Sequence, residues 1–287
     1  MAFSRYMVTA PLRFVPLLLA LLPSPAAFAQ GKATDPVQLA ERLSSSSKEA
    51  RRQAAFELAQ LGKKAEPALA ALVKALGDRD QQVLFQVAQA LAGIGPPAEA
   101  AVPGLIRNLR SGDRQVSYRS AYALGRIGPA AVPELIKMLG SDSSSARAAS
   151  ARALSWVKPP PPAAVEPLIG ALGDSEDSVH RNASEALGGY GEVAAGLAKA
   201  LGSAEAPIRR GSARALSLMG SGAEPAVPAL VKALEDGDAP VRGSAVSALS
   251  KLGLPAERLV PMLMARLEDP EASVRSSAVQ ALSRQRP

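Results

Sequence analysis

The chain has 287 residues, of which 47% are hydrophobic and only 3% aromatic, and it carries a formal charge of +7. It contains no cysteine, which excludes a disulfide framework and a thiol nucleophile. A charge this modest permits contact with anionic surfaces but does not require it.

Residues 1–29 have the pattern of a secretory signal peptide. Two arginines precede the nine-residue apolar run 14–22, and residues 27–29, Ala-Phe-Ala, form a small-x-small cleavage site. A membrane anchor is the alternative, but the apolar run is short and prolines interrupt it. We therefore expect cleavage after Ala29, a periplasmic or secreted protein without a transmembrane segment, and a mature charge of +5 after loss of the two arginines.

Residues 30–34 are expected to form a flexible lead-in, and residues 35–287 one elongated domain of about eight two-helix repeats. The second helix of each repeat begins its apolar stripe at one residue, which we call the anchor, and later positions are numbered as offsets from it. Apolar residues at offsets 0, 4, 7, 8 and 11 form one stripe of the helix. A leucine seven residues before each anchor closes a preceding helix. The spacing of 29 to 33 residues between anchors indicates a repeat array. The anchors are Ala50, Val83, Val116, Ala146, Val179, Ile208, Val241 and Val274.

One repeat, residues 238–253, shows the shared pattern completely: an acid, then Val-Arg, then Ala-x-Ala-Leu and a closing Gly. These positions are Asp238, Val241-Arg242, Ala245, Ala248-Leu249 and Gly253. The pattern resembles HEAT repeats, particularly the short bacterial kind also found in phycobilin-lyase-like proteins. The resemblance implies an all-α fold, an α-α superhelix whose second helices line a concave surface. It says little about the task, because one solenoid fold hosts many unrelated functions.

Two charged positions recur around the anchor. An acid three residues before it is expected to cap or face the N-terminus of the second helix. An arginine directly follows it in five repeats, and the HEAT resemblance implies hydrogen bonds between this acid and this arginine in neighbouring repeats. Leu84, Ser117 and His180 replace the arginine, so we expect the series to be broken in repeats two, three and five. The acids are Asp80, Asp113, Glu176, Glu205, Asp238 and Glu271.

The sequence predicts a protein that is not an enzyme. His180 is the only histidine and occupies the arginine position, so we interpret it as a structural substitute. One histidine cannot build a multi-histidine metal site, and no Ser/His/Asp set is present. We expect no catalytic residue, no metal and no cofactor. Phycobilin-lyase-like activity is the alternative that the resemblance leaves open.

Repeat four departs from the pattern, because it closes on Val157-Lys158 and is followed by Pro159–Pro162. A proline run is stiff and cannot continue a helix. We interpret it as a rigid loop between repeats; a joint at 158–162 between two half-arrays, or an exposed polyproline ligand, are the alternatives.

The candidate binding site lies opposite the buried stripe, at offsets 2, 3, 6 and 10 of the second helices. In repeats one to four these positions gather aromatic residues and arginines, the types that dominate interface energetics. We predict that they bind another protein, with packing of some rings between repeats as the alternative. The predicted residues are Phe85, Tyr118, Arg119, Tyr122, Arg126, Arg152 and Trp156.

Nucleic-acid binding along the same groove is a further alternative, against which export argues. Its mark would be a steep dependence of binding on salt concentration. The arginines that could contact phosphates are Arg119, Arg126, Arg152, Arg181, Arg210 and Arg214.

Overall fold

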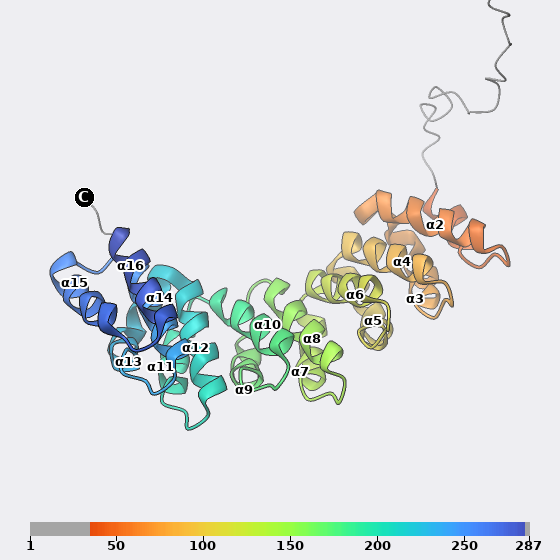
Figure 1. Ribbon diagram of the computed structural model, residues 1–287. Helices are drawn as coiled ribbons and strands as arrows, with labels where there is room; N and C mark the ends of the chain where they lie inside the picture. The colour runs from red at the N-terminus through yellow and green to blue at the C-terminus, as the bar shows by residue number, and fades with distance from the viewer. Residues whose placement is uncertain (1–34, 285–287) are drawn as a thin grey trace, which may run out of the picture. The chain divides into compact units, whose positions relative to one another are not determined.

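The computed structural model describes residues 35–284, which form sixteen α-helices joined by turns and short 3-10 helices, with no strand in that range (Figure 1). The described residues form one compact unit. No helix within the described range is long and apolar enough to cross a membrane. The predicted signal peptide, 1–29, and the lead-in, 30–34, lie outside the described residues.

The first helix of each repeat is short. Seven of these helices span seven residues and the eighth spans ten. They are α1 (Pro36–Arg42), α3 (Leu69–Ala75), α5 (Val102–Asn108), α7 (Val132–Met138), α9 (Val165–Ala171), α11 (Ala194–Ala200), α13 (Val227–Ala233) and α15 (Ala256–Ala265).

The second helix is longer, 12 to 14 residues, and carries the predicted apolar stripe. These helices are α2 (Lys48–Leu61), α4 (Gln81–Ile94), α6 (Arg114–Ile127), α8 (Ser144–Trp156), α10 (Asp177–Gly188), α12 (Ala206–Met219), α14 (Ala239–Ser250) and α16 (Ala272–Ser283).

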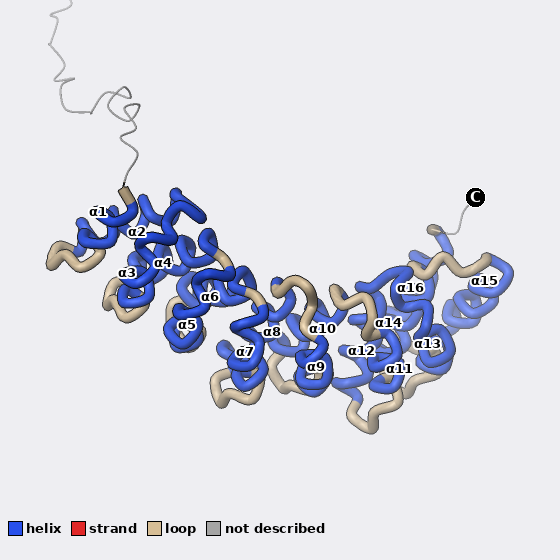
Figure 2. The backbone as a smooth tube through the Cα atoms, turned by 180° about the vertical axis from the view of Figure 1, so that it is seen from behind, coloured by secondary structure: helices blue, strands red, loops and turns tan. Residues whose placement is uncertain are grey.

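Helices that occupy the same position in successive repeats are neighbours in space. Each second helix packs against the second helix of the next repeat, from α2 through α16, and against the first helix of its own repeat (Figure 2). The second helices therefore form a continuous row, whose outward side carries the residues at offsets 2, 3, 6 and 10. The predicted all-α solenoid of about eight two-helix repeats is confirmed.

The core consists of the thin layers that the stripe predicts. The offset-8 leucines from Leu58 to Leu249 are completely buried, and each contributes roughly 1.5–3 kcal/mol through burial. Leu282, at the same offset in the last repeat, is only partly buried. The array is thus held together by repeated small contacts between neighbours rather than by one thick core.

Glycine ends several of the second helices, α4 and α6 among them, but not in the left-handed helical conformation in which a glycine commonly closes a helix. Gly95 has φ 77° and ψ −138°, and Gly128 has φ 85° and ψ −134°. Both φ values are positive, which a side chain disfavours. The ψ values differ from a left-handed cap because the chain turns at once into a 3-10 helix, Pro96–Ala101 in one case and Pro129–Ala131 in the other.

The proline run follows α8 and leads into the 3-10 helix Pro162–Ala164. The Lys158–Pro159 peptide bond is cis. Across the run, α8 packs against α10, and the buried hydroxyl of Tyr190 donates to the carbonyl oxygen of Leu154 at 3.2 Å. Burial raises the pKa of this phenol above its ordinary value.

Arginines that follow the anchors pair with the next repeat, but the acid is not the one predicted. Arg51 Nε donates to Asp78 Oδ2 at 2.6 Å, and its Nη1 donates to the carbonyls of Ser45 and Ser46 at 3.1 and 3.3 Å. The acid lies 27 residues after the arginine, five residues before the next anchor. The same pair recurs as Arg147–Asp174, Arg209–Asp236 and Arg242–Asp269, and we call these four pairs the arginine–aspartate ladder.

Three of the six predicted acids cap the start of the second helix instead. Asp80 and Asp113 each accept two backbone N–H groups of the helix that follows, and Asp238 accepts one. The glutamates at this position make no side-chain cap, because the longer side chain suits that geometry less well. Asp80 and Asp238 also pair between repeats, but with a second arginine, Arg52 or Arg210.

The ladder is broken where predicted. In the repeat that follows each missing arginine, the position five residues before the anchor is Ser111, Ser141 or Ser203, so the acid is lost together with its partner. A buried carboxylate without its arginine would be costly, which explains the joint loss. Repeats two and three, three and four, and five and six are therefore joined by packing without this ion pair.

Candidate partner-binding site

Three aromatic residues from two neighbouring second helices meet on the outward side of the row. The rings of Tyr118 and Tyr122, on α6, approach the ring of Trp156, on α8, at centroid distances of 5.6 and 5.4 Å. Both pairs are edge-to-face, with interplanar angles of 83° and 80°. Such pairs are favoured by the ring quadrupoles and contribute about 0.5–1.5 kcal/mol beyond burial.

Two arginines extend this group across three helices. The Arg119 guanidinium on α6 lies 4.9 Å from the ring centroid of Phe85 on α4. The Arg152 guanidinium on α8 lies 5.7 Å from the ring centroid of Tyr118. We call Phe85, Tyr118, Arg119, Tyr122, Arg152 and Trp156 the aromatic–arginine cluster.

The structure brings together six of the seven predicted residues. The seventh, Arg126, is exposed at the C-terminal end of α6 and is in contact with none of the cluster's rings through a cation–π or ion-pair interaction. Tyr118 remains 40% exposed, whereas Tyr122 and Trp156 are partly buried against the core. The three rings therefore pack between repeats and also present part of their surface to solvent.

A glycine allows α6 and α8 to approach at the cluster. A Cβ atom on Gly125 would lie 2.6 Å from the Cβ of Trp156 and 2.9 Å from the carbonyl oxygen of Ala153. Repeat five uses the same device, since a Cβ on Gly188 would lie 2.7 Å from the Cβ of Leu218. Trp156 and Leu218 occupy equivalent positions, so Leu218 is the natural control for Trp156.

A hollow of about 370 Å³ opens beside the cluster, between α6, α8 and α10. Tyr118 and Arg152 form part of its wall, together with Arg114 and Asn182 and small Ser, Gly and Ala residues. We call it the Arg152 hollow. Arg114 and Asn182 were not predicted as site residues.

Asn182 holds Arg152 in place. Its side-chain oxygen accepts from Arg152 Nη2 at 3.0 Å, and its Nδ2 donates to the carbonyl of Ala148 at 2.8 Å. The asparagine is 4% exposed, so both ends of its amide are used inside the protein. The only sequence signal for this role is that Asn182 occupies offset 3 in the repeat next to the predicted cluster.

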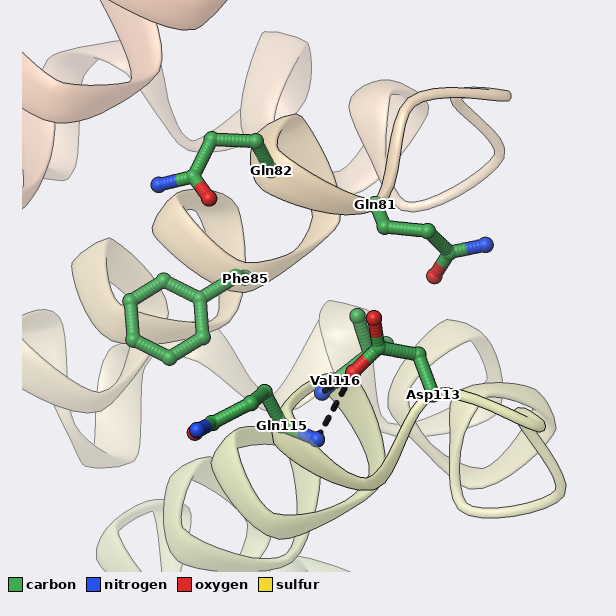
Figure 3. A pocket seen from close by; sticks show the side chains of 6 residues that line it. All are labelled: Gln81, Gln82, Phe85, Asp113, Gln115 and Val116. Carbon is green, nitrogen blue, oxygen red and sulfur yellow. Dashed lines mark hydrogen bonds between the residues drawn. The ribbon is translucent and has the colours of Figure 1, made fainter.

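A second hollow of about 290 Å³ lies one repeat earlier, between α4 and α6 (Figure 3). Phe85, Gln82 and Gln115 project toward the same space, and Asp113 lies at the edge, where its Oδ1 accepts from the backbone N–H of Gln115 at 2.7 Å. We call it the Phe85 hollow. Phe85 and Tyr118 share offset 2, so the two hollows are successive copies of one inter-repeat groove.

The cluster carries positive charge without neighbouring acids on its own helices. Helices α4, α6 and α8 contain five arginines and no acidic residue. Of these five, only Arg147 forms an ion pair within the described residues, with Asp174 of the ladder. The hydrogen bonds from Arg147 lower the pKa of Asp174, so that carboxylate is ionised at neutral pH.

Farther along the row, two of the basic residues are neutralised locally. Arg181 pairs with Asp177 on the same helix, and Arg210 pairs with Asp238 of the next repeat. A hollow of about 470 Å³ at α12, α14 and α16 is lined mainly by serine, with Arg214 and Leu218 at one side. The surface of the later repeats therefore differs from the cluster in both charge and shape.

His180 stands at a broken ladder position, as predicted. Its Nε2 lies 3.3 Å from Asp177 Oδ1, and burial, followed by the charge of Arg214, lowers its pKa below the ordinary value. Residues 35–284 contain no group of three or more His, Cys, Asp or Glu side chains that could hold a metal ion.

Stacked two-helix layers with their second helices in one continuous row define an α-solenoid. Three overlapping or adjacent segments, 36–113, 102–188 and 194–283, match the family model for HEAT repeats. The chain belongs to the HEAT-repeat family, as the sequence resemblance predicted.

The solved structures that are similar to this chain include two engineered proteins. One is 26% identical, with 87% of this chain and 78% of that chain covered and a TM-score of 0.42. The other is 22% identical, with 87% and 96% covered and a TM-score of 0.31. Comparison with curated proteins found no match. The family assignment rests on the HEAT-repeat model alone.

Proposed function

We propose that this HEAT-repeat protein is a non-enzymatic scaffold that binds another protein through the aromatic–arginine cluster. The observation that carries the proposal is the meeting of six aromatic and arginine residues from three consecutive repeats on one side of the row. Tyrosine, tryptophan and arginine are the residues that most often dominate binding energy at protein interfaces. The leader-like sequence of residues 1–29 supports export to the periplasm or the medium as the place where this occurs.

Affinity capture from an exported fraction tests the proposal, with the mature protein as bait and mass spectrometry as readout. The test variant replaces Tyr118, Tyr122 and Trp156 by alanine. The control variant replaces Arg214 and Leu218, which occupy the same offsets on α12 as Arg152 and Trp156 on α8. We expect a partner that is lost with the test variant and retained with the control, with far-UV circular dichroism unchanged. Equal recovery by both variants would refute the assignment.

Nucleic-acid binding has weaker support. A nucleic-acid strand follows a continuous basic groove, but Arg181 and Arg210 are each paired with an aspartate beyond the cluster. Phycobilin-lyase-like activity remains the enzyme alternative, and a visible absorbance band from a co-purified bilin would favour it.

A further inference from the structure

The charge of the candidate surface is one-sided. In α4, α6 and α8 every charged residue is an arginine, and Arg114, Arg119, Arg126 and Arg152 form no ion pair within the described residues. Elsewhere on the same row, Arg52, Arg181 and Arg210 each have an acidic partner. Because these four arginines lie on one surface and pair with no acidic side chain of the protein itself, they favour a ligand that supplies the negative charge.

The Arg152 hollow shows where such a charge fits. Arg114 and Arg152 are the only residues lining it that are charged at neutral pH. Arg152 uses one N–H group on Asn182, and its guanidinium carbon lies 5.7 Å from the centroid of the Tyr118 ring. A guanidinium has five N–H donors, so Arg152 retains donors for a carboxylate, whose two oxygens can accept in a bidentate manner.

The position of Arg152 is also fixed in advance. Asn182 is anchored by its own bond to the Ala148 carbonyl, and it holds the guanidinium at the wall of the hollow. A side chain that is already ordered loses less conformational entropy when a ligand binds. This distinguishes Arg152 from an exposed surface arginine such as Arg214.

We propose that the occupant of this surface is an acidic peptide segment of the partner protein, with an Asp or Glu side chain in the Arg152 hollow. The inference deepens the proposed function and depends on it. A hollow of about 370 Å³ accommodates a single side chain. In the preceding groove, Gln82 and Gln115 offer amides to the peptide backbone and Phe85 offers an apolar surface. Asp113 borders that hollow, so the acidic residue of the ligand belongs in the Arg152 hollow and an uncharged residue in the Phe85 hollow.

A peptide fits these features better than a nucleic acid does. The positive surface extends over only two helices, α6 and α8, and ends where Arg181 and Arg210 are neutralised. The rings of Tyr118 and Tyr122 are each engaged edge-to-face with the ring of Trp156, whereas nucleic-acid bases require open ring faces on which to stack. A short segment that places one carboxylate and one apolar side chain satisfies both hollows.

Selection from a displayed library of random twelve-residue peptides on the full chain tests the inference. We expect the selected peptides to be enriched in Asp and Glu. The best peptide, labelled and with both ends blocked, is then titrated by fluorescence anisotropy against wild type, Arg152→Ala and the matched control Arg214→Ala. Loss of the charge-assisted hydrogen bonds should weaken binding about tenfold or more in Arg152→Ala, while Arg214→Ala binds as wild type does. Replacement of the peptide's Glu and Asp by Gln and Asn should weaken binding to wild type similarly.

Each contrary result has a distinct meaning. Selection of neutral or basic peptides, no selection at all, or equal binding by Arg152→Ala overturns the acidic-peptide inference. If the captured partner still depends on Tyr118, Tyr122 and Trp156, the proposed function survives that failure. A labelled oligothymidylate that binds more tightly than the best peptide, with the same dependence on Arg152, would replace the peptide by a nucleic acid. Undiminished partner capture by both the cluster variant and the control variant would instead refute the proposed function.

Discussion

Substitution of Gly125 by alanine probes how closely α6 and α8 must approach for the cluster to form. Alanine is normally the better helix residue, by about 0.5–1 kcal/mol. At this position, however, the new methyl group would lie 2.6 Å from the Cβ of Trp156 and 2.9 Å from the carbonyl oxygen of Ala153. Because the second contact is with backbone, a change of side-chain rotamer cannot relieve it, and the two helices must move apart.

The expected net effect is destabilisation. Overpacking of a close-packed site costs about 1–3 kcal/mol, and the backbone contact at Gly125 favours the upper end, about 3 kcal/mol. Subtracting the intrinsic gain of about 1 kcal/mol leaves about 2 kcal/mol. For an array of this size we expect the melting temperature to fall by roughly 4–8 °C.

Gly170→Ala provides the matched control, because Gly170 also lies in a helix, α9, and a methyl group added there would have no atom within 4 Å. It should raise stability by about 0.5–1 kcal/mol. Both variants can be followed by thermal circular dichroism, and Trp156, the only tryptophan of the chain, reports the local change by fluorescence. A Gly125→Ala variant as stable as Gly170→Ala, with unchanged tryptophan emission, would refute the close-approach argument.

Three further predictions concern the contacts between repeats. Arg242→Ala should lower the free energy of unfolding, measured in urea, by about 3–5 kcal/mol, because it leaves the Asp269 carboxylate, whose side chain is 1% exposed, without its ion-pair partner. The double variant Arg242→Ala, Asp269→Ala should recover part of that loss. No recovery would argue against a buried-charge penalty. The pKa of Asp80 is lowered to about 2, chiefly by the hydrogen bonds from Arg52. The contribution of this carboxylate to stability is therefore complete above its ordinary pKa and is lost as pH falls from about 4 through 2. Asp80→Asn should flatten the fall in melting temperature over that interval, and an unchanged pH profile would contradict the assignment. Tyr190→Phe should lower stability by about 1 kcal/mol, since the hydroxyl donates to a buried carbonyl; a calorimetric melting temperature equal to that of wild type would show that the bond contributes nothing.

The architecture could be predicted from sequence because it depends on residues that recur at fixed offsets. The offset-8 leucine recurs in all eight repeats. In repeats two and three a glycine also follows the isoleucine, Ile94 or Ile127, that ends the second helix. Each of these recurring residues therefore indicates the same local environment in every repeat that contains it. The conformation of those glycines could not be predicted, because ψ depends on the direction in which the following 3-10 helix leaves.

The acid of the ladder was wrongly predicted for a geometric reason. Asp78 and Asp80 are two residues apart in one turn, and only the fold of that turn decides which carboxylate faces Arg51. The sequence does contain the missing signal. Wherever a repeat with the ladder arginine is followed by another repeat, an aspartate stands five residues before the next anchor, and serine stands there, as in Ser111, after each repeat without the arginine.

Most of the candidate site could be predicted from helical offsets, since six of the seven residues lie together. Arg126 does not join them, because it lies in the last turn of α6, beyond the turn that carries Tyr118 and Tyr122. Arg114 could not be found in the same way, and Asn182, although it occupies offset 3, lies in repeat five, outside the repeats on which the prediction rested. Asn182 reaches the site from the next repeat, and Arg114 lies before the anchor, outside the offsets that define the outward side.

Two of the gaps in the arginine–aspartate ladder coincide with the aromatic–arginine cluster. Phe85, Tyr118 and Trp156 span the two consecutive junctions, between repeats two and four, where serine replaces the ladder aspartate. The junctions on either side are clamped by Arg51–Asp78 and Arg147–Asp174. The cluster therefore supplies contacts between repeats at the two junctions that lack the ladder ion pair. A ligand that lies across the cluster would therefore contact three consecutive repeats where no ladder pair joins them.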